Sequence, residues 1–209
     1  NEPEEAMAIA QLIAYKYSAD LDKVAILIRS RRQAVAIQHA LLRQGTKAHL
    51  VGVIPFAKNT HVADCLAVIK WFYNKEDFSS FARFAGTFNG IGAKSISNIY
   101  DELQKANWEI TEEYKNSKND KIIFFLDFLQ KLSFLENDFA GMFLFFVDNY
   151  YNQYLTKKFE DAKERFEDLL SIYDYGKNCE NIDEFLEYFS LDADIETAET
   201  KGNCNGKVS

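Results

Sequence analysis

The chain is poor in residues that break helices and in residues that build metal or disulfide sites. Its 209 residues include only nine glycines and two prolines, which argues against a fold of many short strands. Its three cysteines and three histidines are widely spaced, so we expect no disulfide framework, no metal site and a reducing, cytoplasmic setting. No apolar run is long enough to cross a membrane, because five charged residues interrupt the most apolar region, 122–151.

Positive charge is also scarce, and it is unevenly distributed. The net charge is −8. Residues 1–74 carry nine Lys/Arg against six Asp/Glu, a balance of +3, whereas residues 75–209 carry fifteen against twenty-six, a balance of −11. This distribution excludes a protein that holds nucleic acid through a broad positive field, so a DNA contact in the second part must be local.

What the chain does have is an apolar, aromatic-rich sequence with helical periodicity. It is 47% hydrophobic and contains eighteen phenylalanines, enough for a substantial core. The fold class that we predict is mainly α, with Gly45 ending the second helix and the helix at 121–135 buried on all sides. The periodicity predicts helices over 3–18, 32–43, 62–73, 78–85, 93–106, 121–135, 139–155, 159–173 and 182–189.

Two short segments depart from the helical pattern. Val24 to Ile28 is a continuous apolar run, which is typical of a strand buried on both faces, and Lys47 to Val53 is a second strand candidate. A strand, a helix and a strand of this length predict a pair of parallel strands. Because two strands bury too little to stand alone, and because 207–209 resembles the start of another strand, we expect the chain to be part of a larger protein.

The stretch from 88 to 99 is typical of a helix-hairpin-helix turn. Gly90, Ile91 and Gly92 separate two helical patterns, and Lys94 and Ser95 lie in the first turn of the second helix. The glycines leave room for a phosphate, the free N–H groups of the helix attract an anion, and the lysine adds a charge. These five residues are the DNA-binding candidates; the alternative is an ordinary tight turn between helices.

Several short segments, taken in order, carry a family pattern. They are AILIRS at 25–30, GVIPF at 52–56 followed by VAD at 62–64, NKED at 74–77, GIG at 90–92, RFEDL at 165–169, and FL at 185–186 followed by SL at 190–191. Together they resemble the UvrD/Rep/PcrA-type superfamily 1 DNA helicases. Pro55, Ala57 and Asn89 replace residues that are usually arginine, aromatic and arginine in that family, so the chain resembles a divergent member.

The resemblance implies a domain organisation and a function. It implies that 1–74 are part of the second RecA-like (2A) domain, with two parallel strands, that 75–197 are the helical accessory (2B) domain, and that 198–209 lead back to the RecA-like domain. The parent protein would be an ATP-dependent 3′–5′ DNA helicase that uses ATP and Mg²⁺ and acts at junctions of single-stranded and duplex DNA. Its partners would be the remaining helicase domains and accessory repair proteins.

The chain itself lacks the residues that such chemistry needs. No Gly-x-x-x-x-Gly-Lys-Ser/Thr phosphate loop occurs, so we expect the isolated chain neither to bind ATP appreciably nor to unwind DNA. The alternative function is that of a non-enzymatic helical protein-interaction module with an acidic surface.

Four further residues are candidates for positions near nucleotide or DNA: Arg29, Ser30, Phe56 and Asp64. Arg29 and Ser30 follow a predicted strand, where they would lie near nucleotide or DNA or would form a salt bridge. Phe56 would stack on a base or pack in the core. We expect Asp64 to position a neighbouring backbone group or arginine, and His61 to be a surface residue of its helix.

Overall fold

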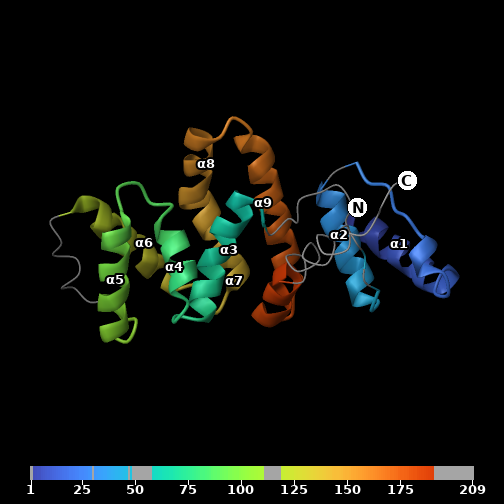
Figure 1. Cartoon of the computed structure of the whole chain (residues 1–209), viewed down its shortest axis with the longest axis horizontal. Helices are drawn as coiled ribbons and strands as arrows, with labels where there is room; N and C mark the ends of the chain where they lie inside the picture. Colours follow the sequence, from blue (N-terminus) through green and yellow to red (C-terminus); the bar gives the residue numbers. More distant parts are fainter. Residues whose placement is uncertain (1, 30, 47, 49–57, 111–118, 191–209) are drawn as a thin grey trace, which may run out of the picture. The chain divides into compact units, whose positions relative to one another are not determined.

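The structure is a computed structural model that describes residues 2–29, 31–46, 48, 58–110 and 119–190 (Figure 1). These residues are mainly helical and contain no β-strand, which confirms the mainly α class. The chain divides into two compact units, Asn1–Asn59 with Asp183–Ser209, and Thr60–Ile182. These boundaries differ from the predicted domain limits at 74/75 and 197/198, and the identity of the domains stays a prediction.

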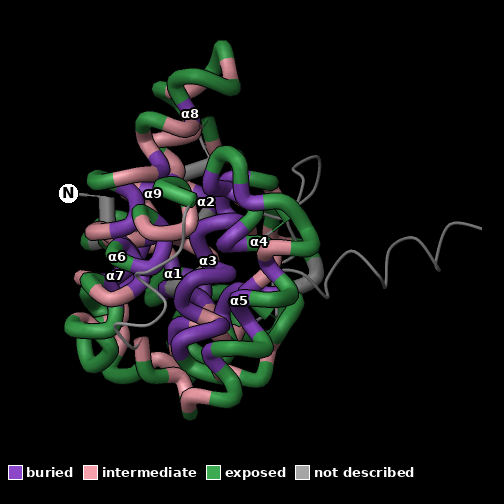
Figure 2. Tube along the Cα trace, turned by 90° about the vertical axis from the view of Figure 1, so that its left-hand side faces the viewer, coloured by how far each residue is buried: buried purple, intermediate pink, exposed green. Residues whose placement is uncertain are grey.

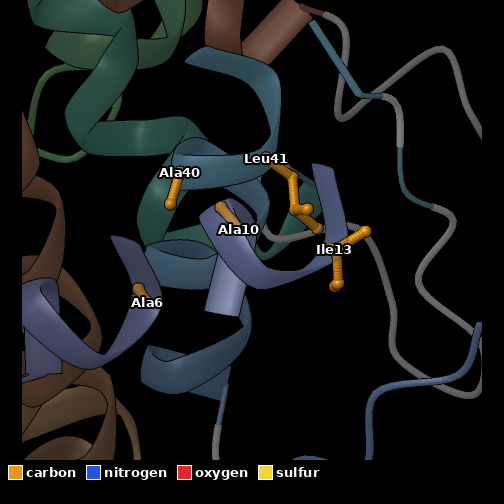
Figure 3. Packing of buried hydrophobic residues seen from close by; sticks show 5 residues of the cluster. All are labelled: Ala6, Ala10, Ile13, Ala40 and Leu41. Carbon is orange, nitrogen blue, oxygen red and sulfur yellow. The ribbon is translucent and has the colours of Figure 1, made fainter. Parts of the chain in front are cut away.

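The first unit is built on a pair of helices, α1 (Glu2–Lys16) and α2 (Arg31–Arg43), with a short 3₁₀ turn, η1 (Leu21–Lys23), between them. The buried positions of α1 recur at helical spacing, so they lie on one face that packs against α2 (Figure 3). The residues of this buried cluster are Ala6, Ala10, Ile13, Ala40 and Leu41.

The end of α2 has the geometry that its sequence predicts. Gly45 has a φ of +72°, a left-handed conformation that glycine adopts without strain. Its N–H donates to the carbonyl of Leu42 at 2.8 Å, and the N–H of Thr46 donates to the carbonyl of Leu41 at 2.9 Å. This pair of bonds is a Schellman motif, so the prediction that Gly45 ends the helix is confirmed.

The predicted parallel strands are not seen. Residues 24–28 form no regular element, and their exposure alternates. Val24 and Ile26 are half-buried against the α1–α2 cluster, whereas the side chain of Leu27 is 98% exposed. The segment is therefore covered on one face, and the prediction of burial on both faces was wrong. Its predicted partner, 47–53, lies outside the described residues except for Ala48.

The second unit is a bundle of helices around α3, which is buried along most of its length (Figure 2). Its helices confirm the predicted ones to within a few residues at each end, as does helical structure at 182–190. They are α3 (Thr60–Tyr73), α4 (Phe78–Ala85), α5 (Ala93–Lys105), α6 (Asp120–Ser133), α7 (Phe139–Phe146), α8 (Asn152–Lys158) and α9 (Ala162–Gly176).

Helix α6 is not buried on all sides, which corrects the prediction. Phe125 and Leu129 are among its buried residues, but Lys121 and Asp127 are exposed and the side chain of Phe124 is 52% exposed. The apolar pattern all round the helix therefore overstates its burial. The large side chains on one side of the helix enter the core, and those on the opposite side are exposed to water.

A π-helical segment, η4 (Val147–Tyr151), joins α7 to α8 without a break. The side chain of Tyr151 is fully buried, and the preceding residue, Tyr150, is half-buried. The wider turn of a π-helix changes which residues face inward, and such segments often occur at functional sites. Here two successive tyrosines contact different parts of the unit.

Two kinds of site are absent from the described residues. None of their helices combines the length and the apolarity that a membrane crossing requires. No group of three or more His, Cys, Asp or Glu side chains in the same part of the chain is placed to hold a metal ion.

Candidate nucleic-acid interface

The first helix of the hairpin, α4, begins at a well-formed cap. The carboxylate of Asp77 accepts a hydrogen bond from the backbone N–H of Ser80 at 3.0 Å. Burial tends to raise the pKa of Asp77, but hydrogen bonds from Ser80 and Ser79 outweigh it and the pKa is lowered. The charged carboxylate therefore fixes the start of α4, and the aromatic rings of Phe81 and Phe84 on this helix are fully buried.

The turn between α4 and α5 is anchored by apolar side chains. Phe88 is 3% exposed and Ile91 is 6% exposed, so both pack into the core. The N–H of Phe88 donates to the carbonyl of Ala85 at 3.0 Å, and the N–H of Ile91 donates to the carbonyl of Phe88 at 3.2 Å. Ile91 is thus part of the packing that holds the turn.

Tyr150, from the π-helical segment, contacts the turn through both its ring and its hydroxyl. Its ring stacks on that of Phe88 with the centroids 4.0 Å apart and the planes 7° apart. Its hydroxyl donates to the backbone carbonyl of Thr87 at 2.7 Å. Burial raises the pKa of Tyr150 to about 12, against a backbone hydrogen bond from Asn89 that lowers it. The hydroxyl is therefore a neutral donor at ordinary pH.

The two glycines of the turn differ in the space that a side chain would have at their positions. Gly90 has a φ of +86°, and a Cβ placed on it would lie 2.5 Å from Nζ of Lys121. Gly92 is the N-cap of α5 and would meet no atom within 4 Å of an added Cβ. The first position thus allows a close contact with a lysine, and the second leaves open space in front of the helix N-terminus.

The sequence-predicted residues 90–95 lie on one turn, and the structure adds a cation to them. Lys94 is exposed and Ser95 is half-buried in the first turn of α5. Lys121, which the sequence analysis did not identify, comes from the first turn of α6 and lies against Gly90. Nothing in the local sequence signals this contact, since it depends on how α6 packs beside the hairpin. The arrangement offers helix N–H groups and two ammonium groups to an anion.

Arg29 lies in the other compact unit, is exposed, and its backbone N–H donates to Oε1 of Gln33 at 3.2 Å. Ser30 and Phe56 lie outside the described residues. Their proposed positions near nucleotide or DNA therefore stay predictions.

Asp64 is a buried residue within the second unit. Its Oδ1 accepts from Nε of Arg83 at 2.8 Å, and its Oδ2 accepts from the hydroxyl of Tyr151 at 2.7 Å. This contact confirms the interpretation that Asp64 positions an arginine. Burial raises the pKa of Tyr151, and the neighbouring charges of Cys65 and Asp64 act in the same direction. Asp64 thus ties α3 to α4 and to the π-helical segment.

The interpretation of His61 as a surface residue was wrong. Its side chain is 2% exposed because α9 packs against the first turn of α3. Nη1 of Arg165 lies 3.1 Å from Nδ1 of His61, and Nε2 of His61 lies 3.2 Å from Oδ2 of Asp168. Since an arginine only donates, Nδ1 accepts and the hydrogen on Nε2 points to the carboxylate. His61 therefore connects two charged residues more than a hundred positions away.

Comparison with known proteins shows that the chain is similar to parts of DNA helicases. The family model described as "UvrD-like helicase C-terminal domain" matches residues 1–205. DNA helicase II of Haemophilus influenzae is 25% identical over 98% of this chain and 32% of its own length. The ATP-dependent DNA helicase srs2 of Schizosaccharomyces pombe is 25% identical over 83% of this chain and 22% of its own length.

A third relative matches a shorter part. The ATP-dependent DNA helicase PcrA of Bacillus subtilis is 32% identical over 38% of this chain and 11% of its own length. The chain thus spans about a third or less of the curated relatives that it matches. The family model, by contrast, covers nearly every residue of the chain. The chain therefore belongs to the family of UvrD-like helicase C-terminal domains.

Proposed function

We propose that this chain is part of an ATP-dependent DNA helicase that moves 3′ to 5′ along single-stranded DNA, and that its hairpin turn contacts the duplex backbone. The family and the names of the relatives, which are DNA helicases, support the general activity. The direction of movement and the role of the hairpin are our inference. The parent protein would use ATP and Mg²⁺, while the isolated chain, without a phosphate loop, would be inactive.

The assignment of domains belongs to the same proposal. We assign residues 1–74, which include α1, α2 and α3, to the second RecA-like domain, residues 75–197 to the accessory domain, and residues 198–209 to the return to the RecA-like domain. The exposed Leu27, which alternates with half-buried Val24 and Ile26, supports the first assignment. An extended segment covered on one face only is what remains of a sheet when the helices on its other face belong to another part of the protein.

The observation that carries the DNA contact is the exposed end of the hairpin. Gly92 leaves open space at the start of α5, Lys94 is exposed in the first turn of that helix, and Lys121 lies against Gly90. The turn is held in place by Phe88 and Tyr150, so a phosphate would meet N–H groups that are already oriented. This makes a local contact, which suits a region whose overall charge is negative.

The charge of Lys94 provides the test. We expect Lys94→Glu to weaken binding of the 209-residue chain to a labelled duplex with a 3′ single-stranded tail, as measured by fluorescence anisotropy at several salt concentrations. Loss of one phosphate contact should reduce the slope of log K against log salt by about 0.9. The matched control is Lys105→Glu, which reverses an exposed charge at the other end of the same helix.

The two variants separate a local contact from a general field effect. The proposal requires that Lys94→Glu lower both the affinity and the salt slope while Lys105→Glu leaves them near those of the unchanged chain. Equal effects of the two reversals, or no effect of Lys94→Glu, would remove the hairpin from the DNA interface. Circular dichroism of both variants establishes that each is folded.

A further inference from the structure

A cavity of about 330 Å³ lies in the second unit, away from the hairpin turn. Its walls are aromatic, formed by Trp71, Phe72 and Trp108, and Leu129 contributes further apolar surface. Both tryptophans of the chain line it, with their ring centroids 6.1 Å apart and their planes at 77°. The size and the lining are those of a pocket that accepts an apolar or aromatic group.

The backbone beside the cavity is in an unusual conformation. Asn107 and Trp108 have φ angles of 52° and 67°, and they are the two non-glycine residues with positive φ in the described part of the chain. A bulky residue such as tryptophan is rarely left-handed, because its Cβ approaches the following carbonyl. The N–H of Trp108 donates to the carbonyl of Leu103 at 2.7 Å, and the N–H of Asn107 donates to that of Gln104 at 3.1 Å, so this turn is a Schellman motif that ends α5. The motif places Trp108 directly after the helix, in the lining of the cavity.

The polar part of the cavity is an ion pair set against the aromatic wall. Nζ of Lys75 lies 3.0 Å from Oε1 of Glu136 and 3.7 Å from the ring centroid of Phe72. Burial lowers the pKa of Lys75, although Glu136 acts to raise it. The side chain of Glu136 is half-exposed, so its carboxylate is accessible from the solvent side of the cavity.

Further carboxylates lie beyond the lining of the cavity, near Tyr100. The hydroxyl of Tyr100, whose ring lies 5.3 Å from that of Trp108, donates to the carbonyl of Lys75. Burial raises the pKa of Tyr100, and the charges of Glu76, Asp77 and Asp101 raise it further. A polyanion such as DNA would be repelled by these carboxylates, whereas a cationic segment would be attracted.

We propose that this cavity binds a short basic segment of a partner protein, which places one aromatic side chain in the cavity against Trp108 and a cationic side chain on Glu136. Three features support this occupant: the aromatic walls, the accessible carboxylate and the negative charge around them. The site does not depend on the hairpin turn, so failure of the DNA contact would leave it unaffected.

The two tryptophans make the site directly observable. We would titrate the full 209-residue chain with the peptide acetyl-Lys-Arg-Phe-Arg-Lys-amide, which contains no tryptophan, and follow tryptophan emission. We expect a saturable shift to shorter wavelength, because the inserted phenylalanine excludes water from Trp108. The effect should weaken with added salt, since the ionic contacts are near the surface.

Control peptides and variants separate the contribution of the aromatic side chain to binding from that of the ionic contact with Glu136. Replacing the phenylalanine of the peptide with alanine should weaken binding at least about tenfold, because the aromatic anchor provides most of the apolar burial. Glu136→Gln should weaken binding of the first peptide about fivefold, which is the scale of an exposed ion pair. Asp127 is an exposed carboxylate on α6 that does not line the cavity, so Asp127→Asn should leave binding of the first peptide unchanged.

Three results would overturn the proposal. One is the absence of a saturable change in emission with the basic peptide. Another is equal binding of the acidic peptide acetyl-Glu-Asp-Phe-Asp-Glu-amide. The third is a saturable response to oligothymidylate without a response to the basic peptide, which would make the cavity a base-binding site instead.

Discussion

Tyr150 connects the surface of the hairpin turn to the core of the second unit. Its ring stacks on Phe88 and its hydroxyl donates to the backbone carbonyl of Thr87, so one side chain fixes both an apolar and a polar part of the turn. Tyr151, the next residue, bonds to Asp64 on the opposite side. Successive residues of a helix point about 100° or somewhat less apart, so the two neighbouring tyrosines contact different parts of the unit.

The buried hydroxyl of Tyr150 should make the stability of the chain depend on pH in the alkaline range. We expect Tyr150→Phe to destabilise the chain by about 1 kcal/mol near neutral pH, because it removes one hydrogen bond and keeps the ring stack. The folded pKa is about 12, above the value near 10 of an unfolded tyrosine, so the unfolded chain releases this proton first. The stability that Tyr150 contributes is therefore present below about pH 10 and is lost as the pH rises through about 12.

Urea unfolding at a series of pH values tests this dependence. The difference in free energy of unfolding between the unchanged chain and Tyr150→Phe should be constant below about pH 10 and should shrink between about pH 10 and 12. The other tyrosines titrate equally in both proteins and cancel in the difference. A difference that stays constant through this range would mean that Tyr150 is not buried as described.

At the scale of the elements, a polar cluster joins the start of α3 to α9. His61 accepts from Arg165 and donates to Asp168, while the guanidinium of Arg165 also pairs with Asp161 at 2.7 Å and lies 4.1 Å from the ring of Phe159. Buried polar groups cost free energy unless they are paired, so the histidine makes the close approach of these two helices possible.

Removal of this histidine should therefore weaken the packing of the two helices. We expect His61→Leu to lower the free energy of unfolding by about 1–3 kcal/mol, because it removes the two hydrogen bonds that the buried imidazole makes with Arg165 and Asp168. Urea unfolding at neutral pH measures the change. The control is Lys163→Ala, an exposed substitution on α9 that should have an effect within about 0.5 kcal/mol. Equal stability of His61→Leu and the unchanged chain would contradict the role given to the cluster.

The helices were predictable from the sequence because their signals are local. The range predicted for α4 agrees with the structure, and its start is fixed by a capping carboxylate four residues before the first buried phenylalanine, Phe81. The turn residues at 90–95 were predictable for the same reason, since glycines and a helix start are read directly from the chain. Neither the burial of His61 nor the position of Lys121 at Gly90 could be predicted, because each depends on a helix distant in sequence.

The segment at 24–28 shows a different limit of prediction from the sequence. An apolar run predicts burial, but it does not say which neighbours provide the cover. In the structure Val24 and Ile26 contact the α1–α2 cluster, while Leu27 is left exposed. Burial on both faces requires elements beyond those described, so the sequence pattern correctly indicates an apolar segment and overstates how much of it this part of the chain covers.

At the scale of the whole molecule, the two compact units have very different cores. The α1–α2 cluster of the first unit contains three alanines together with Ile13 and Leu41, and the unit's C-terminal segment adds the buried rings of Phe185, Tyr188 and Phe189. The second unit buries many large rings, among them Phe81, Phe84 and Phe125. Since apolar stabilisation follows the area removed from water, the second unit should resist local unfolding much more strongly.

Hydrogen exchange of the full 209-residue chain tests this difference without separating the units. We expect the slowest amides of α1 and α2 to exchange at least about tenfold faster than those of α3 and α7, because small side chains bury less apolar area per residue. Similar protection in both units would show that the first unit has cover beyond its α1–α2 cluster. If the first unit is part of a RecA-like domain, as proposed, the same amides should become markedly slower when the chain is extended to the length of its relatives. Unchanged exchange of α1 and α2 in the longer protein would then count against the assignment of this unit, while leaving the hairpin proposal to its own test.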